Sequence, residues 1–295
     1  MSNLSVENVY TRHTAKDLAK KYFWKLLGMM AIVYGITYAI SMAGTSLLSL
    51  TGDKGIIAVG SFVLMLVSVL VSSGLNLGLH AAMLDLCRDN GPITVGRVFG
   101  RMGQCLKACG LNLWVGLKMI LWALPAYAVM IAVAVLDIGS VNATTVSEST
   151  FATLAILPFI GLIFIFALVV PAALRYMLSA FVLADKPETG VFECVKQSKT
   201  MMKGHKWQAF KLIIPIILVM YVIMILIAFA FTFILSAFGN AAAAGILGMV
   251  MFVVLLFTML YFVMRIELSY ALFYIKRVNE QNPAQEAAQE PAQAE

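Results

Sequence analysis

Three residues that could bind an anion stand inside long apolar segments of the sequence: His80, Arg175 and Arg265. Each lies about ten positions before its segment ends, and a serine follows each arginine four positions later. Arginine presents a fork of donors that suits phosphate and carboxylate oxygens, so the three could form one anion site. Alternatively they lie at headgroup level and anchor their helices there. Glu267, two positions from Arg265, would neutralise part of an anion site.

The sequence lacks the constellations on which membrane enzymes commonly depend. No carboxylate lies deep in an apolar segment, and the three histidines, His13, His80 and His205, are isolated. Intramembrane proteolysis needs paired aspartates, a serine with a base, or a His-Glu-x-x-His motif. Cys105 and Cys109 are four apart, without the further ligands that zinc spacing requires. We therefore predict no enzyme activity, no metal and no cofactor.

The elements that carry these residues have the composition of membrane spans. Of the 295 residues, 61% are hydrophobic and 12% are charged, whereas a soluble domain has about a quarter charged residues. An apolar run of about 18 or more residues is typical of a transmembrane helix, and the alternation of barrel strands is not seen. We predict an all-α polytopic helical membrane protein whose domain covers 1–278. Its six transmembrane helices are expected at about 24–50, 56–84, 112–136, 151–184, 208–238 and 243–275.

Positive charge falls on one side of these spans. Of the 21 Lys and Arg residues, only Lys54 lies in a segment that six alternating spans place outside. Because cytoplasmic loops collect Lys and Arg, both termini are predicted to face the cytoplasm. The four cysteines fall on that same side, where thiols stay reduced. This topology accounts for the pI near 9.1, so we predict no nucleic-acid partner and expect the anionic inner leaflet instead.

A short basic-aromatic phrase occurs twice, as WVGLK at 114–118 and as WQAFK at 207–211. Tryptophan and lysine suit the depth at which a span enters lipid, because the indole ring is apolar and the lysine can reach a phosphate. Lys118 and Lys211 are therefore candidate lipid-headgroup contacts. The same offset superposes Val98-Phe99 on Val191-Phe192, and a weaker copy covers 14–27. We predict three parallel two-helix repeats, although membrane helices often begin with an aromatic residue and lysine.

A helix with one basic face is predicted before each copy of the phrase. In 95–109 the apolar residues recur every three or four positions, and Arg97 and Arg101 take the opposite face. In 191–203 the opposite face carries Lys196, Lys199 and Lys203. This pattern is typical of an amphipathic helix lying in the membrane interface. Thr94, Thr189 and Thr14 are the candidate caps of the three helices, Thr14 with Asp17 in a capping box.

Small residues and prolines are placed where helices could pack closely or break. Gly74 and Gly78 in the second span, and Gly245 and Gly248 in the sixth, indicate close packing within the chain or, alternatively, self-association. The third to fifth spans contain Pro125, Pro158, Pro171 and Pro215, which could line a cavity or be ordinary membrane-helix prolines. The acidic, proline-containing tail at 279–295 is predicted to be disordered.

One stretch, 170–212, carries a distinctive series of features. They are a proline break, an aromatic helix end, an Asp-x-Pro turn, a Ser…Met-Met-x-Gly-x-Lys segment and a late Tyr…Phe-Tyr segment. The residues in these roles are Pro171, Tyr176, Asp185, Pro187, Ser198, Met201, Met202, Gly204, Lys206, Tyr270, Phe273 and Tyr274. The series resembles that of an uncharacterised bacterial integral-membrane family, the domain of unknown function 975. Its break usually reads Pro-Gly, where this chain has Pro171-Ala172. The resemblance implies a bacterial multi-pass membrane protein and supplies no activity.

These observations predict a protein of the bacterial cytoplasmic membrane that is a non-enzymatic scaffold, sensor or lipid-interacting protein. The alternative is a permease or a transporter of lipids or small molecules, with the proline-broken spans forming its path. A polar cavity reaching the middle of the membrane, lined by Asn76, Tyr127 or Tyr221, would favour the alternative. A solid bundle would favour the first function.

Overall fold

The computed structural model describes residues 2–49, 54–88, 94–140, 165–237 and 241–281, and every element within them is helical. In chain order these elements are α1 (Ser2–Lys21), α2 (Phe23–Ser49), α3 (Lys54–Cys87), η1 (Val95–Gln104), α4 (Cys105–Ser140), η2 (Ile165–Val169), α6 (Val170–Tyr176), α7 (Ser179–Asp185), α8 (Val191–Met201), α9 (Lys206–Ala237) and α10 (Ala241–Gln281). Residues 282–295 of the predicted tail, and the start of the predicted fourth span with Pro158, lie outside the described residues.

In the part of the chain that the structure describes, six helical segments are long and apolar enough to cross a membrane, in agreement with the predicted all-α class and with the predicted number of spans. They are Phe23–Ser46, Ile57–Cys87, Val95–Pro125, Phe166–Asp185, Lys206–Ile234 and Gly245–Gln281. The third begins well before the predicted position 112, because η1 continues directly into α4. The amphipathic segment at 95–109 is therefore no separate α-helix. The first part of this segment is η1, a 3-10 helix of ten residues. Three of these residues are glycines, which disfavour the α conformation.

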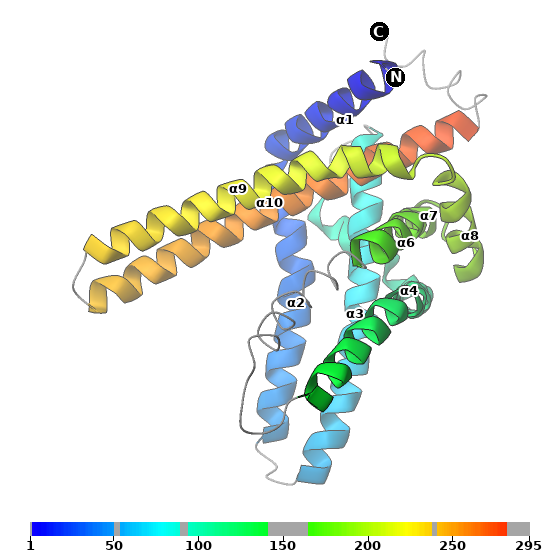
Figure 1. Cartoon of the computed structure of the whole chain (residues 1–295). Helices are drawn as coiled ribbons and strands as arrows, with labels where there is room; N and C mark the ends of the chain where they lie inside the picture. The colour runs from blue at the N-terminus through cyan, green and yellow to red at the C-terminus, as the bar shows by residue number, and fades with distance from the viewer. Residues whose placement is uncertain (1, 50–53, 89–93, 141–164, 238–240, 282–295) are drawn as a thin grey trace.

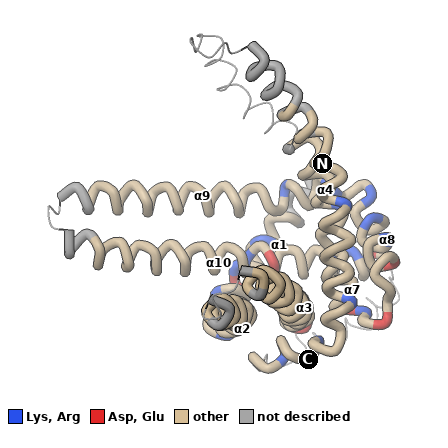
Figure 2. Tube along the Cα trace, turned by 90° about the horizontal axis from the view of Figure 1, so that it is seen from below, with Lys and Arg blue, Asp and Glu red and all other residues tan. Residues whose placement is uncertain are grey.

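The helices form a common body from which three arms extend. The α2–α3 hairpin, α4, and the α9–α10 hairpin leave this body in different directions (Figures 1 and 2). Lys and Arg gather at the body, and the arms carry almost none (Figure 2). Large apolar side chains such as Phe62, Phe229 and Phe252 are exposed along the arms. Such surface needs no protein cover where it faces lipid chains, which are as apolar as the side chains.

The buried core lies in the body, where the charged ends of the arms meet. Leu75 and Met83 of α3, Phe181 of α7, Met202 after α8 and Tyr274 of α10 are all less than 2% exposed. The last part of α10 also packs against α1, which is drawn above the α9–α10 hairpin in Figure 1. The body thus fixes the relative positions of α3, α4, α7, α8 and α10, which carry the polar side chains described below.

Gly78 permits the closest approach in the body. A Cβ at this position would overlap the backbone carbonyl of Val98 in η1, and one at Gly74 would lie 2.9 Å from the Cβ of Cys105. Gly74 and Gly78 therefore serve close packing within the chain, which is the first of the two interpretations given for them; the alternative was self-association. A Cβ at Gly245 or Gly248 would meet nothing within 4 Å, so these two leave the α10 surface open.

The predicted helix starts are only partly right. Thr94 does precede η1, but its side chain makes no capping hydrogen bond, and α8 starts after Gly190 rather than Thr189. Thr14 caps nothing, because α1 begins at Ser2 and the Thr14 hydroxyl donates to the carbonyl of Tyr10 at 3.1 Å. The polar residues before Thr14 continue the helix, so the capping-box interpretation was wrong.

The prolines differ in their effect. Pro125 and Pro215 lie inside α4 and α9, which continue through them. Pro171 instead stands in the first turn of α6, directly after the π-helical η2, and α6 is separated from α7 by a two-residue turn. A proline is tolerated in a first turn because its missing N–H has no helical partner there. The fourth span is therefore the irregular one.

Candidate functional site

A groove of about 440 Å³ lies between α4 and α8 on the surface of the body. We call it the lysine groove, defined by Trp114, Lys118, Phe192, Val195, Lys196, Lys199, Thr200 and Lys203. Four of these eight residues are lysines and none is acidic. It contains four residues singled out from the sequence, and it joins Lys118 of one repeated segment to three lysines of the next.

The α8 helix presents its lysines because its other face is held by the body. Cys194, Val195, Ser198 and Met201 are buried, and the Ser198 hydroxyl donates to the carbonyl of Arg175 at 2.8 Å. Lys199 is left exposed on the opposite face. The predicted amphipathic character of 191–203 is therefore present, with the apolar stripe rotated away from Phe192, which is 68% exposed.

Two aromatic rings, Trp114 of α4 and Phe192 of α8, line the lysine groove. The Phe192 ring meets Trp114 edge to face, with ring centres 4.9 Å apart. The Lys118 ammonium lies 4.8 Å from the centre of the Trp114 ring. Outside the groove, the Lys211 ammonium has the same relationship to Trp207 at 5.4 Å. Both copies of the repeated phrase thus form a cation–π pair, which the four-residue spacing on a helix permits.

The charges around the lysine groove are only weakly compensated. Glu193 lies 3.7 Å from Lys196, and both side chains are exposed, so the pair is screened by solvent. Next to Glu193, the side chain of Cys194 is buried, and this burial raises the pKa of its thiol. The groove can therefore attract an anion through its lysines, and the thiol below it stays protonated at neutral pH.

The three residues predicted as an anion site each have a different partner. Nε2 of His80 lies 3.4 Å from Glu267 Oε2, and its ring meets Phe181 edge to face. The Arg175 guanidinium lies 5.1 Å from the Trp122 ring centre. Arg265 accepts a hydrogen bond at its carbonyl from Ser269, and its Nε finds no partner among the described residues. No hydrogen bond or ion pair within the described chain joins the three, and an anion-binding role for them stays a prediction.

A small cavity with both polar and apolar lining residues adjoins His80 between α3, α4 and α7. Its polar lining consists of Ser73, Asn76, His80 and Asn112, with Asn112 donating to the Ser73 hydroxyl at 3.1 Å. The cavity of about 20 Å³ has room for about one water molecule. Nδ1 of His80 is buried without a hydrogen-bond partner in the described part of the chain. Asn76 was an expected cavity residue, whereas Tyr127 and Tyr221 are exposed on the arms.

A partly buried ion pair that the sequence did not predict joins the end of α3 to α7 and α10. Arg88 NH1 donates to Asp185 Oδ1 at 2.6 Å, and the Tyr274 hydroxyl donates to Asp185 Oδ2 at 2.9 Å. The hydrogen bond to Asp185 raises the pKa of the Arg88 guanidinium. Asp185 and Tyr274 were noticed only as features of a family resemblance, and no local signal at Arg88 indicated its partner 97 positions away.

A second polar cluster surrounds Arg277 near the end of α10. The Arg277 side chain is 4% exposed and contacts Glu280, Gln208 and His205. The Asn8 amide donates to the carbonyl of Gln208 at 3.4 Å, which joins α1 to this cluster. The cluster pairs the terminal nitrogens of a buried arginine, whose Nε has no hydrogen-bond partner in the described chain, and it holds α1, α9 and α10 together.

The remaining predicted interfacial residues lie on η1. Arg97 pairs with Asp85 of α3 at 2.6 Å, so this arginine helps to fasten η1 to α3. Arg101 is partly buried, one turn further along. The arginines of η1 therefore leave less unpaired positive charge on the surface than the lysines of α8 do.

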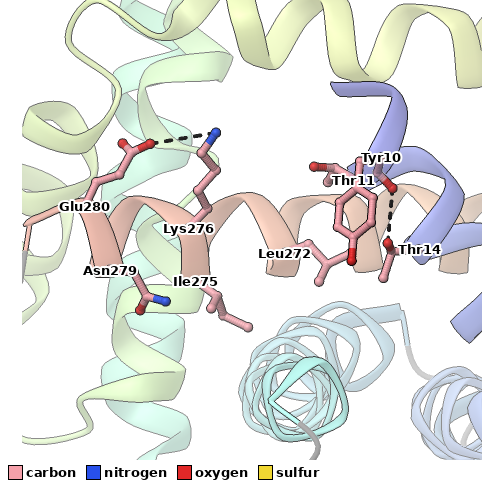
Figure 3. Close-up of a pocket in the computed structure, with 8 residues that line it drawn as sticks. All are labelled: Tyr10, Thr11, Thr14, Leu272, Ile275, Lys276, Asn279 and Glu280. Atoms are coloured by element: carbon pink, nitrogen blue, oxygen red, sulfur yellow. Dashed lines mark hydrogen bonds and ion pairs between the residues drawn. The ribbon is translucent and has the colours of Figure 1, made fainter. Parts of the chain in front are cut away.

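A cleft of about 490 Å³ between α1 and α10 is less suited to select a charged ligand. Figure 3 shows Lys276 and Glu280 paired at one end and Tyr10 and Thr14 at the other. The Lys276 ammonium lies 3.7 Å from Glu280, so the charges in this lining compensate each other. Among the described residues, no group of three or more His, Cys, Asp or Glu side chains could hold a metal ion.

Six apolar spanning helices with their charges gathered at one end are those of a multi-pass α-helical membrane protein. Within that class, the profile of the family described as "Protein of unknown function (DUF975)" matches residues 9–282. The chain belongs to this family, which confirms the resemblance inferred from 170–212. No curated protein and no solved structure matches the chain significantly.

Proposed function

We propose that the protein is a lipid-interacting membrane protein whose lysine groove holds the phosphorylated headgroup of an anionic lipid. One observation carries this proposal: Lys118 and the three lysines Lys196, Lys199 and Lys203 line one groove with Trp114. An ammonium group near an anionic membrane surface contributes about 1 kcal/mol, so four of them favour binding substantially.

The surroundings of the lysine groove also suit the apolar part of a lipid. Leu121 is 53% exposed and lies seven positions after Trp114, which places it on the same face of α4. Leu117 and Leu124 beside it are exposed as well. A headgroup in the groove would therefore have its acyl chains beside the apolar α4 arm. This succession of polar and apolar contacts is the one that a phospholipid requires.

We infer the finer architecture from the charge pattern and the repeated phrase. The body would lie at the cytoplasmic face of a bacterial inner membrane, with both termini on that side, since Lys and Arg concentrate there. Shorter helical segments, α1, η1 and α8, precede α2, α4 and α9, which supports three parallel two-helix repeats with interfacial helices. In this arrangement the lysine groove faces the anionic leaflet. The protein would act as a non-enzymatic scaffold or sensor of that leaflet.

Lipid retention by matched triple variants tests the proposal. Lys196, Lys199 and Lys203 are replaced by Gln in one variant, and Lys16, Lys20 and Lys21 of α1 in the other, so that both lose three positive charges. Native mass spectrometry of protein purified with phosphatidylglycerol then counts bound lipids. We expect at least a fivefold loss for the groove variant and less than a twofold loss for the α1 variant. Equal retention in the two variants would refute a specific groove site.

The alternative function, a permease or transporter, has one observation in its favour. The cavity beside His80 has four polar residues in its lining and lies between three helices of the body. Its room for about one water molecule suits a water or a proton better than a larger solute. Proteoliposome uptake of a panel of small solutes that depends on Asn76 and His80 would favour this function over lipid binding.

A further inference from the structure

A second groove, of about 310 Å³, lies between α8 and the end of α10. Lys186, Glu193, Lys196, Gln197, Thr200, Met201, Val278 and Gln281 line it, and we call it the α8–α10 groove. Gln281 is the last residue before the described part of the chain ends. The described part of the chain therefore ends at this groove.

The α8–α10 groove and the lysine groove adjoin each other. Lys196 and Thr200 belong to both linings, so α8 forms their shared wall. Together the two linings contain five lysines and one carboxylate, Glu193, which lies 3.7 Å from Lys196. An extended strip of positive charge thus runs from Gln281 along α8 to Lys203, just after the helix ends.

The sequence after Gln281 has the opposite charge. Residues 282–295 contain Glu286, Glu290 and Glu295 and neither Lys nor Arg. We propose that the α8–α10 groove is a docking site for this acidic segment of the same chain. Its carboxylates would face the lysines of α8 in place of an external anionic partner.

The length of the segment matches the distances involved. An extended chain advances about 3.5 Å per residue, so Glu286 reaches up to about 17 Å from Gln281. Lys186 and Lys196 line the same groove as Gln281, so we expect Glu286 to reach them. Lys203 lies seven residues beyond Lys196, about 10 Å further along a helix, which Glu290 and Glu295 can cover. Because the tether is short, its effective concentration at the groove is in the millimolar range.

A docked segment and a lipid headgroup would compete for the lysines that the two grooves share. This consequence rests on the proposed function, whereas docking itself does not. Removal of the three glutamate charges should therefore increase phosphatidylglycerol binding at least threefold, if the lysine groove also binds lipid. The two proposals are distinguished by measuring docking first, in detergent without anionic lipid.

Photo-crosslinking in the full-length chain tests the docking. Benzoylphenylalanine replaces Ala288, between Glu286 and Glu290, and mass spectrometry maps the intramolecular cross-links. We expect cross-links to 186–203, and at least a fivefold decrease when Glu286, Glu290 and Glu295 are changed to Gln. A control that changes Gln285 and Gln289 to Asn keeps the charge and should retain the full yield. Lys186→Gln combined with Lys196→Gln should lower the yield as the glutamate variant does.

Three results would overturn the docking proposal. The cross-links could map to residues outside α8 and α10, or their yield could be independent of the glutamate charges. In the third, the yield would be low in the unaltered chain while phosphatidylglycerol protects Lys186 from acetylation, so that a lipid headgroup occupies the α8–α10 groove instead. Each of these results is readable in a folded protein, because Lys186 and Lys196 are exposed and the other altered residues follow the described part of the chain.

Discussion

The Lys118 ammonium group lies 4.8 Å from the centre of the Trp114 ring, one helical turn away on α4. Lys211 and Trp207 repeat this relationship on α9 at 5.4 Å. Only the first pair lines the lysine groove, and the second does not. Variants of Lys118 and Lys211 can therefore distinguish the loss of a cation–π contact from the loss of a positive charge in the lysine groove.

Lys118→Met should weaken anionic lipid binding, whereas Lys211→Met should not. Methionine keeps an unbranched side chain and removes the charge, which contributes about 1 kcal/mol at an anionic surface and so about a fivefold change in affinity. Titration of each purified variant with phosphatidylglycerol nanodiscs measures the difference. Equal affinities for the two variants would remove Lys118 from the site.

Gly78→Ala should destabilise the body strongly, because the new methyl group overlaps the carbonyl of Val98 and neither backbone can yield easily. Overpacking of a core typically costs about 1–3 kcal/mol, and we expect the upper end of this range. Gly248→Ala is the control, since its methyl group meets nothing within 4 Å. Thermal unfolding in detergent compares the two. A lower melting temperature for Gly248→Ala than for Gly78→Ala would contradict this packing.

Arg88→Met should destabilise the protein by about 2 kcal/mol. The loss is smaller than the roughly 3–5 kcal/mol of a fully buried pair, because 26% of the Arg88 side chain remains exposed. Tyr274→Phe removes one hydrogen bond to Asp185 and should cost about 1 kcal/mol. Equilibrium unfolding in mixed detergent measures both.

A double-mutant cycle then shows whether Arg88 acts through Asp185. Arg88→Met with Asp185→Asn should destabilise less than the two single changes added together, since each alone leaves the other charge without its partner. Additive effects would show that the ion pair contributes nothing of its own.

The Cys194 thiol should react slowly, and its contribution to stability should depend on pH. Burial raises its pKa, so the folded protein holds this proton more tightly than the unfolded chain does. The stabilisation is therefore complete below the unfolded thiol pKa of about 8.5 and is lost as the pH rises through the higher folded value.

Two measurements check this behaviour of Cys194. In a chain with Cys87, Cys105 and Cys109 changed to Ser, N-ethylmaleimide at pH 7.5 should modify the folded protein at least a hundredfold more slowly than the unfolded protein. The difference in unfolding free energy between this chain and its Cys194→Ala counterpart should also shrink between pH 8 and pH 10. Equal reaction rates in the two states would show that the thiol is accessible.

Local patterns predicted the spans and the basic face of α8, because hydropathy and helical periodicity act over a few turns. The phrase that contains Trp114 and Lys118 predicted a position at the membrane boundary for both residues, whereas the contact between them was not predicted. The ion pair between Arg88 and Asp185 could not be predicted in this way, since it depends on how α3 and α7 pack. Gly96, Gly100 and Gly103 show a third case, in which a periodic apolar pattern was outweighed by backbone preference, and η1 formed in place of an α-helix.

The charge distribution predicts that Gly55 and Lys199 lie on opposite sides of the membrane. Gly55 follows Lys54 at the start of α3 and is exposed, and Lys199 is exposed on α8. Cytoplasmic segments collect Lys and Arg because positive loops resist translocation, and the body around Lys199 is rich in both. Gly55→Cys should therefore react with a membrane-impermeant maleimide in intact cells. Lys199→Cys should react only after permeabilisation.

Both orientation variants are made in a chain whose four native cysteines are replaced by Ser, so that each carries a single thiol. Cys194 itself is unsuitable as a reporter, since it is fully buried and would stay unlabelled on either side. Position 199 is exposed in the folded chain and can therefore report its side of the membrane, whereas position 194 cannot. Labelling at position 199 in intact cells would place the lysine groove on the outer face, and an inner-leaflet lipid could then not be its ligand.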